Sequence, residues 1–403
     1  MLNIKRILLI SLLLLIGFSS TAQLQDYSFG DGIRYTAKDS TFGIKASFRF
    51  QNLFIADWRV NNDNFSNIGD LSSNFLVRRS RLKFDGLAHS PKLTYKLEIG
   101  LSNRDIDHEG AAYYGEGGNM IYDAFLNWNF YKAFSIKVGQ YKMDGNRERI
   151  ISSADLQFVD RSLLNARFNL DRDIGASLHY DRTFGKQFGL HLIASFAQGE
   201  GRNIISGNMG GYQTTFKIEI RPFGKFKNEG AYFSADLQRE EKPKLAFAIA
   251  LDKNNGVARD RANLGSFFPA DTKYKDLITV FADFMFKYKG FSMMGEYAYR
   301  KTDDNDPRVR DINNNYTIHS YFTGSAINIQ AGYLFKKDFE LAARYTYLDP
   351  QHDFIAAQTN NYTLGFSKYF TGHSLKVQTD LSYIQDQLSD DGLMWRVQFE
   401  IGF

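Results

Sequence analysis

The residues best suited to chemistry in this sequence are arginines gathered in one stretch near its middle. A guanidinium group stays charged at physiological pH, and its planar donors match the paired oxygens of phosphate or carboxylate. Acidic residues in the same stretch, including Glu148 and Asp160, could instead form ion pairs with these arginines. The stretch could therefore be an anion-binding site or a structural network of ion pairs. The arginines are Arg147, Arg149, Arg161, Arg167 and Arg172.

The same stretch, residues 143–175, is unusually apolar for a connection in contact with water. It contains Ile150, Ile151, Leu156 and Phe158, and a solvated loop has little use for such side chains. A loop folded back against an inner wall would bury them. We therefore expect this connection to fold inward, narrow a passage and carry its guanidinium groups to the constriction.

The segments on either side of this stretch alternate between apolar and polar residues. Leu97 and Ile99, for example, fall on one face of a strand, and Lys96 and Glu98 fall on the other. Runs of about ten residues with this period are typical of strands that cross a membrane in a barrel. Aromatic residues make up 15% of the chain although its mean hydropathy is only -0.36, which fits a lipid-facing surface better than the core of a soluble β-sandwich.

Short and long connections alternate along the chain, as they do in barrels with tight periplasmic turns and long outer loops. If every candidate strand is counted, the chain contains about 17 strands. A membrane-spanning strand at residues 231–238 would, however, place the short connection 287–290 on the outer side of the membrane. Residues 223–243 are therefore interpreted as a long periplasmic connection. The sequence predicts an all-β protein, a 16-stranded antiparallel transmembrane β-barrel with an inward-folded third loop and an aqueous lumen.

The first residues have the layout of a cleavable export signal. Lys5 and Arg6 precede the apolar run 7–16, and small residues follow as far as Ala22. The run is too short for a spanning helix, which needs about 20 apolar residues. We expect residues 1–22 to be a signal peptide, residues 23–40 a polar periplasmic segment and residues 41–403 the transmembrane barrel.

The last residues, 393–403, alternate up to a terminal phenylalanine. Residues such as Val397 would face lipid, whereas Arg396 and Glu400 would face the lumen. A strand at the end of a chain needs a partner, and pairing with the first strand removes both edges of the sheet. An ending in Phe403 also resembles the signature that the barrel-assembly machinery recognises, so this machinery and outer-membrane lipid are expected partners.

Charged residues at lumen-facing positions carry the functional prediction. Such groups stay solvated in a wide lumen, so a mixed polar wall is one interpretation, but an excess of bases would concentrate anions. We expect an anion-attracting constriction formed by Arg79, Arg81, Lys83, Lys137, Arg147, Arg149, Arg161, Arg167 and Arg172.

Charge and cysteine content exclude several other classes of function. The chain has 49 basic and 45 acidic residues, and the loss of Lys5 and Arg6 with the signal peptide would leave 47 basic residues. This balance does not favour nucleic acid as a partner. The chain has no cysteine, so it has neither disulfides nor thiolate metal ligands.

Enzymatic and metal-binding alternatives are weak. The seven histidines show no close ligand spacing, and we expect no metal and no cofactor. Hydrolysis of lipid by a barrel needs a serine and a histidine on the membrane face, whereas His179 and His191 fall on inward positions near Ser177 and Ser195. The acidic run 303–306 lacks the rest of an EF-hand, so we interpret it as a solvated outer loop.

Several motifs resemble the phosphate-selective porin O and P family. They are Arg78-Arg-Ser-Arg81, Val138-Gly-Gln-Tyr-Lys142, Arg147-Glu-Arg149, Phe158-Val-Asp-Arg-Ser162 and Arg172-Asp-Ile-Gly175. The resemblance covers nearly the whole mature chain. It implies a homotrimeric barrel in the outer membrane of a Gram-negative cell, with an inward third loop that forms an anion-attracting constriction for phosphate.

The sequence as a whole predicts an exported outer-membrane porin without enzymatic activity. It would form a passive aqueous channel for small polar solutes, with a bias toward anions such as phosphate. The alternative is a structural or adhesive outer-membrane barrel whose lumen is occluded.

Overall fold

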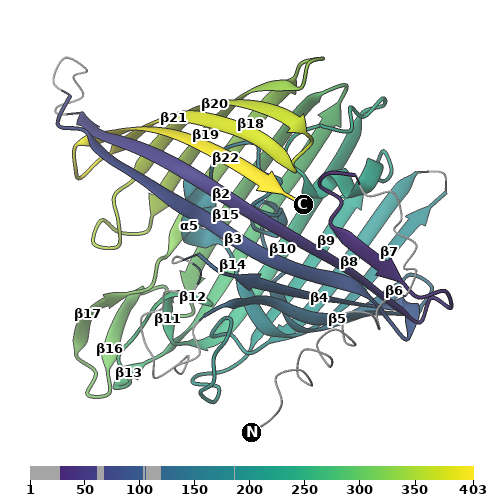
Figure 1. Cartoon of the computed structure of the whole chain (residues 1–403). Helices are drawn as coiled ribbons and strands as arrows, with labels where there is room; N and C mark the ends of the chain where they lie inside the picture. Colours follow the sequence, from purple (N-terminus) through teal and green to yellow (C-terminus); the bar gives the residue numbers. More distant parts are fainter. Residues whose placement is uncertain (1–27, 61–67, 103–104, 106–118, 186) are drawn as a thin grey trace, which may run out of the picture.

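A computed structural model describes residues 28–60, 68–102, 105, 119–185 and 187–403. Sixteen antiparallel strands form a closed ring in it (Figure 1), and each strand of the ring pairs with the next one along the chain. The strands are β2 (Phe42–Val60), β3 (Ser72–Ala88), β4 (Ser90–Gly100), β5 (Ile121–Tyr131), β6 (Phe134–Lys142), β7 (Arg172–Phe184), β8 (Phe188–Ala197), β9 (Gln213–Arg221), β10 (Lys244–Val257), β14 (Lys275–Tyr288), β15 (Phe291–Thr302), β18 (Gly324–Leu334), β19 (Phe339–Pro350), β20 (Thr359–Thr371), β21 (Leu375–Asp386) and β22 (Asp391–Gly402). The prediction of a 16-stranded barrel is confirmed.

The ring closes between its first and last strands. Arg49 of β2 lies opposite Gly402 of β22, and Val60 lies opposite Asp391 at the other end of the same ladder. This pairing leaves no sheet edge between the termini, as the alternating C-terminal residues predicted.

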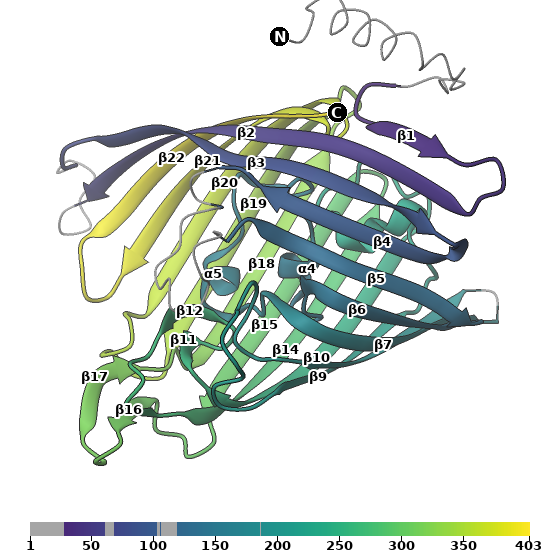
Figure 2. The same ribbon diagram turned by 60° about the horizontal axis from the view of Figure 1, so that its bottom comes forward.

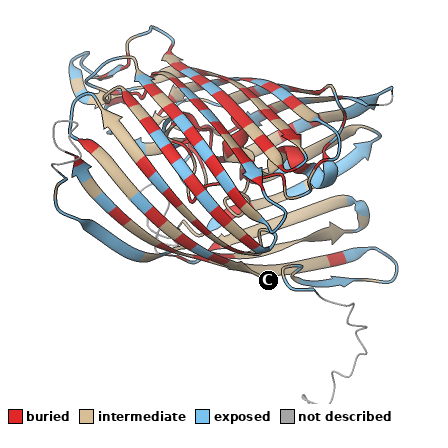
Figure 3. Cartoon of the chain, turned by 90° about the horizontal axis from the view of Figure 1, so that it is seen from above, coloured by how far each residue is buried: buried red, intermediate tan, exposed pale blue. Residues whose placement is uncertain are grey.

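Buried and more exposed residues alternate along many of the strands, as the coloured bands of Figure 3 show. In β10, Phe247, Ile249 and Leu251 are exposed on the outside, whereas Ala248 and Asp252 are buried inside. Large apolar side chains on the outside and polar ones on the inside are the arrangement that a barrel in lipid requires. The helices of the described residues are all too short or too polar to cross a membrane.

Short connections gather at one end of the barrel, here called the turn end, and long connections at the other, the loop end. The connection between β9 and β10, residues 222–243, contains no strand and only the 3₁₀-helix η2 (Lys227–Tyr232). Its assignment as a long connection is therefore confirmed. It folds back toward the barrel interior, because Phe226 and Ala231 are buried in a cluster with Ile151 and Leu156.

The N-terminal residues extend the sheet at the turn end. Strand β1 (Ile33–Thr36) pairs with β2, where Ile33 lies opposite Ala46. The backbones of Phe48 and Phe403 exchange two hydrogen bonds, of 2.7 and 2.9 Å, on the same edge of β2. Strand β1 thus follows directly after β22 along β2 (Figure 2). The predicted signal peptide lies outside the described residues.

The connection between β6 and β7, residues 143–171, is called the inner loop because it lies within the ring of strands (Figure 2). It contains two short helices, α4 (Arg147–Ile150) and α5 (Leu163–Phe168). Helix α5 packs beneath the loop end, where Leu164 and Phe168 join a cluster with Phe268 and Phe322. Five short strands form two small sheets in the outer connections above it: β11 (Arg259–Arg261), β12 (Leu264–Phe267), β13 (Thr272–Lys273), β16 (Arg308–Asp311) and β17 (Tyr316–Ser320).

Candidate functional site

The inner loop fills one side of the lumen. Gln157 donates hydrogen bonds of 3.0 Å to Ser292 of β15 and 2.6 Å to Glu340 of β19. The backbone N–H of Val159 donates to Asp380 of β21 at 3.1 Å. These bonds satisfy buried polar groups of the loop on that wall. The space that the loop leaves free lies on the opposite side, along β3 to β6.

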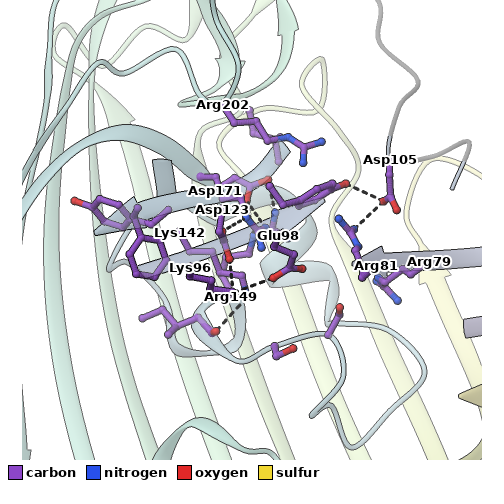
Figure 4. A pocket seen from close by; sticks show the side chains of 18 of the residues that line it. Arg79, Arg81, Lys96, Glu98, Asp105, Asp123, Lys142, Arg149, Asp171 and Arg202 are labelled. Atoms are coloured by element: carbon purple, nitrogen blue, oxygen red, sulfur yellow. Dashed lines mark hydrogen bonds and ion pairs between the residues drawn. The ribbon is translucent and has the colours of Figure 1, made fainter. Parts of the chain in front are cut away.

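A cavity of about 510 Å³ lies between the inner loop and this opposite wall (Figure 4). Its lining includes ten basic residues and five acidic ones, so the formal charge is strongly positive although the whole chain is nearly balanced. The bases are Arg78, Arg79, Arg81, Lys96, Lys137, Lys142, Arg149, Arg161, Arg172 and Arg202. The acids are Glu98, Asp105, Asp123, Asp144 and Asp171.

Six of the nine predicted constriction residues line this cavity: Arg79, Arg81, Lys137, Arg149, Arg161 and Arg172. Lys83 instead lines a second cavity of about 720 Å³, together with Lys45 and with Arg34 of β1. The two cavities share Lys96 and Phe125. The two cavities are therefore neighbours, and basic residues line both of them from the inner loop toward the turn end.

Arg147 lies behind the inner loop, away from the cavity lining. Its side chain is fully buried and donates at 2.7 Å to Asp283, at 2.8 Å to Glu219 and at 2.9 Å to the carbonyl of Ala231. This ion-paired network fixes α4 to the wall. Arg167 is exposed at the end of α5, with its guanidinium carbon 5.4 Å from the ring of Phe322.

A β-bulge brings in Arg78, which simple alternation does not place in the lumen. Gln51 of β2 faces Arg79 but Asn52 faces Val77, so Arg78 has no partner in the ladder. Arg78 and Arg79 both lie 2.9 Å from a carboxylate oxygen of Asp160 on the inner loop. The sequence does contain a signal: the outward-facing apolar residues Phe75 and Val77 occupy odd positions, whereas Leu82 and Phe84 occupy even ones.

A second bulge turns Tyr122 inward. Glu98 of β4 faces Asp123 but Ile99 faces Ile121, so the intervening Tyr122 has no partner in the ladder. The guanidinium carbons of three arginines surround its ring. They lie 3.4 Å from the ring centroid for Arg81, 3.7 Å for Arg202 and 4.7 Å for Arg172.

The ring of Tyr122 holds these cations without neutralising them, because a ring quadrupole attracts a cation but carries no net charge. Its hydroxyl donates to Asp105 at 2.9 Å, and Asp105 also lies 2.7 Å from Arg81. Arg202 comes from the connection between β8 and β9. Alternation gives no information about such a position, and sequence reasoning missed it.

Four bases of the cavity have no carboxylate within 4.0 Å in the described part of the chain: Lys137, Lys142, Arg161 and Arg202. Lys142 donates to the carbonyls of Ile150 and Ile151, at 3.1 and 3.2 Å. Arg161 donates to the carbonyl of Glu148 at 2.8 Å. Burial, together with repulsion from Arg149 and Arg79, lowers the pKa of the Arg161 guanidinium. A bound anion would relieve this repulsion.

Other cavity charges are held in tight pairs. Burial alone would raise the pKa of Asp171, but the charges of Arg149 and Arg172 outweigh it and hold this pKa below its usual range. Arg172 also donates at 2.6 Å to Asp123. The first pair, Arg149 with Asp171, ties α4 to the end of the inner loop and the second, Arg172 with Asp123, joins β7 to β5, while the unpaired bases supply the excess charge.

The histidines of the enzymatic alternative meet inside the barrel. Ser177 Oγ lies 2.8 Å from His179 Nε2, and His179 Nδ1 lies 3.2 Å from His191 Nε2. Ser177 and His179 are buried, whereas a lipid substrate would require a site on the outer face.

Two carboxylates of the acidic run 303–306 form ion pairs with nearby basic residues. Asp304 lies 2.6 Å from Lys275, and Asp306 lies 2.9 Å from Arg308. Within the described ranges, no three histidine, aspartate or glutamate side chains gather closely enough to hold a metal ion.

A closed barrel of 16 strands with a loop-narrowed, charged lumen defines an outer-membrane porin. The chain belongs to the family described as phosphate-selective porin O and P, whose model matches residues 48–393. The family and the fold point to a channel of the outer membrane rather than to an enzyme.

Solved outer-membrane barrels align over most of the chain at low sequence identity. OmpF of Salmonella typhi, in complex with daunomycin, aligns with a TM-score of 0.54 and 11% identity over 91% of this chain and 100% of that one. The DcaP channel of Acinetobacter baumannii gives a TM-score of 0.52 and 11% identity over 91% and 99%. A loop-deletion mutant of OmpT from Vibrio cholerae gives 0.51 and 12% over 89% and 99%. This likeness shows the shared barrel fold, and no curated protein matches the chain in sequence.

Proposed function

We propose that this porin is biased toward small anions of the phosphate type. The single observation that carries the proposal is the excess of ten bases over five acids in the cavity. Four of these bases have no carboxylate partner among the described residues, so the excess is not cancelled locally. A positive potential in a narrow aqueous passage raises the local concentration of anions and lowers that of cations.

Reversal potentials of single channels in planar bilayers test this bias. In a potassium chloride gradient we expect chloride to be more permeant than potassium, and phosphate to reduce the chloride current as it occupies the basic cavity. A clear preference for potassium would refute the proposal. Swelling of liposomes in sugar solutions tests the alternative of an occluded barrel, since a closed lumen admits no sugar.

The inner loop supplies the matched variants. The double substitution Arg149→Ala and Arg161→Ala removes two cavity charges and should reduce the chloride-to-potassium permeability ratio. The single substitution Arg167→Ala removes an exposed charge outside the cavity lining and should leave the ratio unchanged. Equal permeability ratios in the wild type, the double variant and Arg167→Ala would show that the inner loop does not contribute to ion selectivity.

Export and assembly complete the proposal. We infer that residues 1–22 direct export, that Phe403 is recognised by the barrel-assembly machinery and that the barrel forms a homotrimer, as the family resemblance implies. The ring of Phe403 lies 5.6 Å from that of Phe48, so deletion of Phe403 also removes a contact with the first strand. Native mass measurement of the purified protein in detergent tests the trimer, and a monomer would refute it.

A further inference from the structure

The wall of the basic cavity contains aromatic side chains in positions where a water-filled lumen favours polar ones. Tyr122 and Phe125 of β5 and Tyr141 of β6 all line the cavity. Tyr122 is covered by guanidinium groups. Phe125 is only half-buried and lines both cavities, so a solute that moves from one to the other passes its ring.

Phe125 and Tyr141 form a corner with a cation beside it. Their ring centroids lie 6.1 Å apart and their planes meet at 76°. Lys137 Nζ lies 4.9 Å from the centroid of Tyr141 and 5.5 Å from that of Phe125. Since Lys137 has no carboxylate within 4.0 Å among the described residues, an apolar surface lies directly beside a positive charge that is not held in a close ion pair.

Gly139 keeps the wall next to this corner free of side chains. It lies directly opposite Phe125 in the ladder between β5 and β6, with φ of +126°. A Cβ there would lie 2.3 Å from the carbonyl oxygen of Ala124 and 3.1 Å from Cβ of Phe125. Any other residue would therefore strain the backbone and crowd the space beside the Phe125 ring.

We propose that the channel prefers organic anions that carry a flat ring next to a phosphate or carboxylate group, and that Phe125 determines this preference. The inference rests on the proposed anion bias and specifies its substrate class. The anionic group of the solute faces Lys137 and the neighbouring guanidinium groups. Its ring packs against Phe125, which removes apolar surface of both partners from water and adds a ring–ring contact.

Block of the chloride current by three phosphate monoesters tests the preference in planar bilayers. Phenyl phosphate has a flat ring, cyclohexyl phosphate has similar bulk without a flat face, and methyl phosphate has neither. The half-blocking concentration of phenyl phosphate should be about three- to tenfold lower than that of methyl phosphate, the range that one aromatic contact gives. Cyclohexyl phosphate should block less well than phenyl phosphate.

The variant Phe125→Leu keeps an apolar side chain but removes the ring. It should bring the half-blocking concentrations of phenyl and methyl phosphate close together. Phe130→Leu, on the same strand but exposed on the outer face, should behave like the wild type. Phenyl and methyl phosphate of equal potency in the wild type, or an unchanged ratio in Phe125→Leu, would overturn the inference while leaving the anion bias intact.

Failure of the proposed function gives a different result. If none of the three esters blocks the current and potassium is the more permeant ion, both the anion bias and the ring preference are refuted. The comparison among the three esters uses only the wild-type protein, so it decides the question even if a variant does not fold.

Discussion

The guanidinium carbon of Arg202 lies 3.7 Å from the centroid of the Tyr122 ring. One residue comes from the connection between β8 and β9, and the other comes from a bulge in β5. The guanidinium groups of Arg81 and Arg172 also contact this ring. Tyr122 therefore gathers three guanidinium groups on the wall of the cavity: Arg81 and Arg172 are also paired with carboxylates, whereas Arg202 contributes a charge with no carboxylate within 4.0 Å among the described residues.

Replacement of the Tyr122 ring should reduce the anion bias. Tyr122→Leu removes the surface on which the guanidinium groups stack, so we expect Arg81 and Arg202 to spread and the chloride-to-potassium permeability ratio to fall. Tyr122→Phe keeps the ring and loses only the hydrogen bond to Asp105, so its ratio should stay near that of the wild type. Reversal potentials measure both, and a wild-type ratio in Tyr122→Leu would contradict this role.

Arg147 should control stability rather than selectivity. Arg147→Met leaves the buried carboxylates of Glu219 and Asp283 without their arginine, and breaking a buried pair in this way costs about 3–5 kcal/mol. Urea unfolding in detergent micelles, followed by tryptophan fluorescence, measures the loss. The exposed Arg167→Met should change stability by less than about 0.5 kcal/mol. Equal stability of the two variants would contradict the anchoring role.

The contrast between Arg147 and Arg149 shows where the sequence stops being informative. Both arginines belong to the single turn α4, yet Arg147 points to the wall and Arg149 lines the cavity. Alternation predicted the strands and the closed barrel because one face of each strand meets lipid and a shift by one residue would reverse every side chain. A one-turn helix on a folded loop has no such periodic constraint, so its side chains could be assigned only from the structure.

Bulges and loops explain the other differences. Arg78 and Tyr122 each occupy an extra residue in a ladder, which changes the inward position from even to odd numbers along the strand. In the sequence, the outward-facing apolar residues do shift from odd to even positions around Arg78. Arg202 lies on a connection, where its approach to Tyr122 depends on long-range folding. In the sequence Gly139 stands out only as part of the motif Val138-Gly-Gln-Tyr-Lys142, and its position beside Phe125 follows from the register of β5 and β6.

Stability of the inner loop should depend on pH through Asp155. Burial raises the pKa of this carboxyl group to about 6, against the partial opposition of Lys376 and Arg49. Because this value exceeds the 3.8 of the free group, the folded protein holds more protons than the unfolded chain between these pH values. The contribution of Asp155 to stability is thus largest at low pH and is lost as the pH rises through 6.

Asp155→Asn should remove the contribution of this group and so weaken the pH dependence of stability. The fall in stability between pH 4 and pH 7.5 is at most about 3 kcal/mol, at about 1.4 kcal/mol for each pKa unit. Thermal unfolding in detergent, followed by circular dichroism at both pH values, measures it. Asp353→Asn, at an exposed position of an outer loop, provides the control and should keep the dependence of the wild type. An equal dependence in Asp155→Asn would show that another group is responsible.

The connection 222–243 should support the inner loop from the turn end. Phe226 and Ala231 pack on Ile151 and Leu156, and the backbone N–H of Ser234 donates to the carbonyl of Asp155 at 3.0 Å. This support holds the loop segment that contributes Arg149 and Ser153 to the cavity. Without it, the loop loses buried apolar contacts as well as hydrogen bonds, and the charges it carries are no longer held against the opposite wall.

Replacement of residues 224–241 by a two-residue Asn-Gly turn removes this support while keeping β9 and β10 connected as a hairpin. Single-channel conductance should rise, because the space behind the loop opens, and the chloride-to-potassium permeability ratio should fall, because the basic cavity widens. The double substitution Lys227→Ala and Glu241→Ala breaks an ion pair at the exposed surface of the same connection and should change neither quantity. Wild-type conductance and selectivity after the replacement would mean that the inner loop holds its position through its contacts with the strands of the barrel alone.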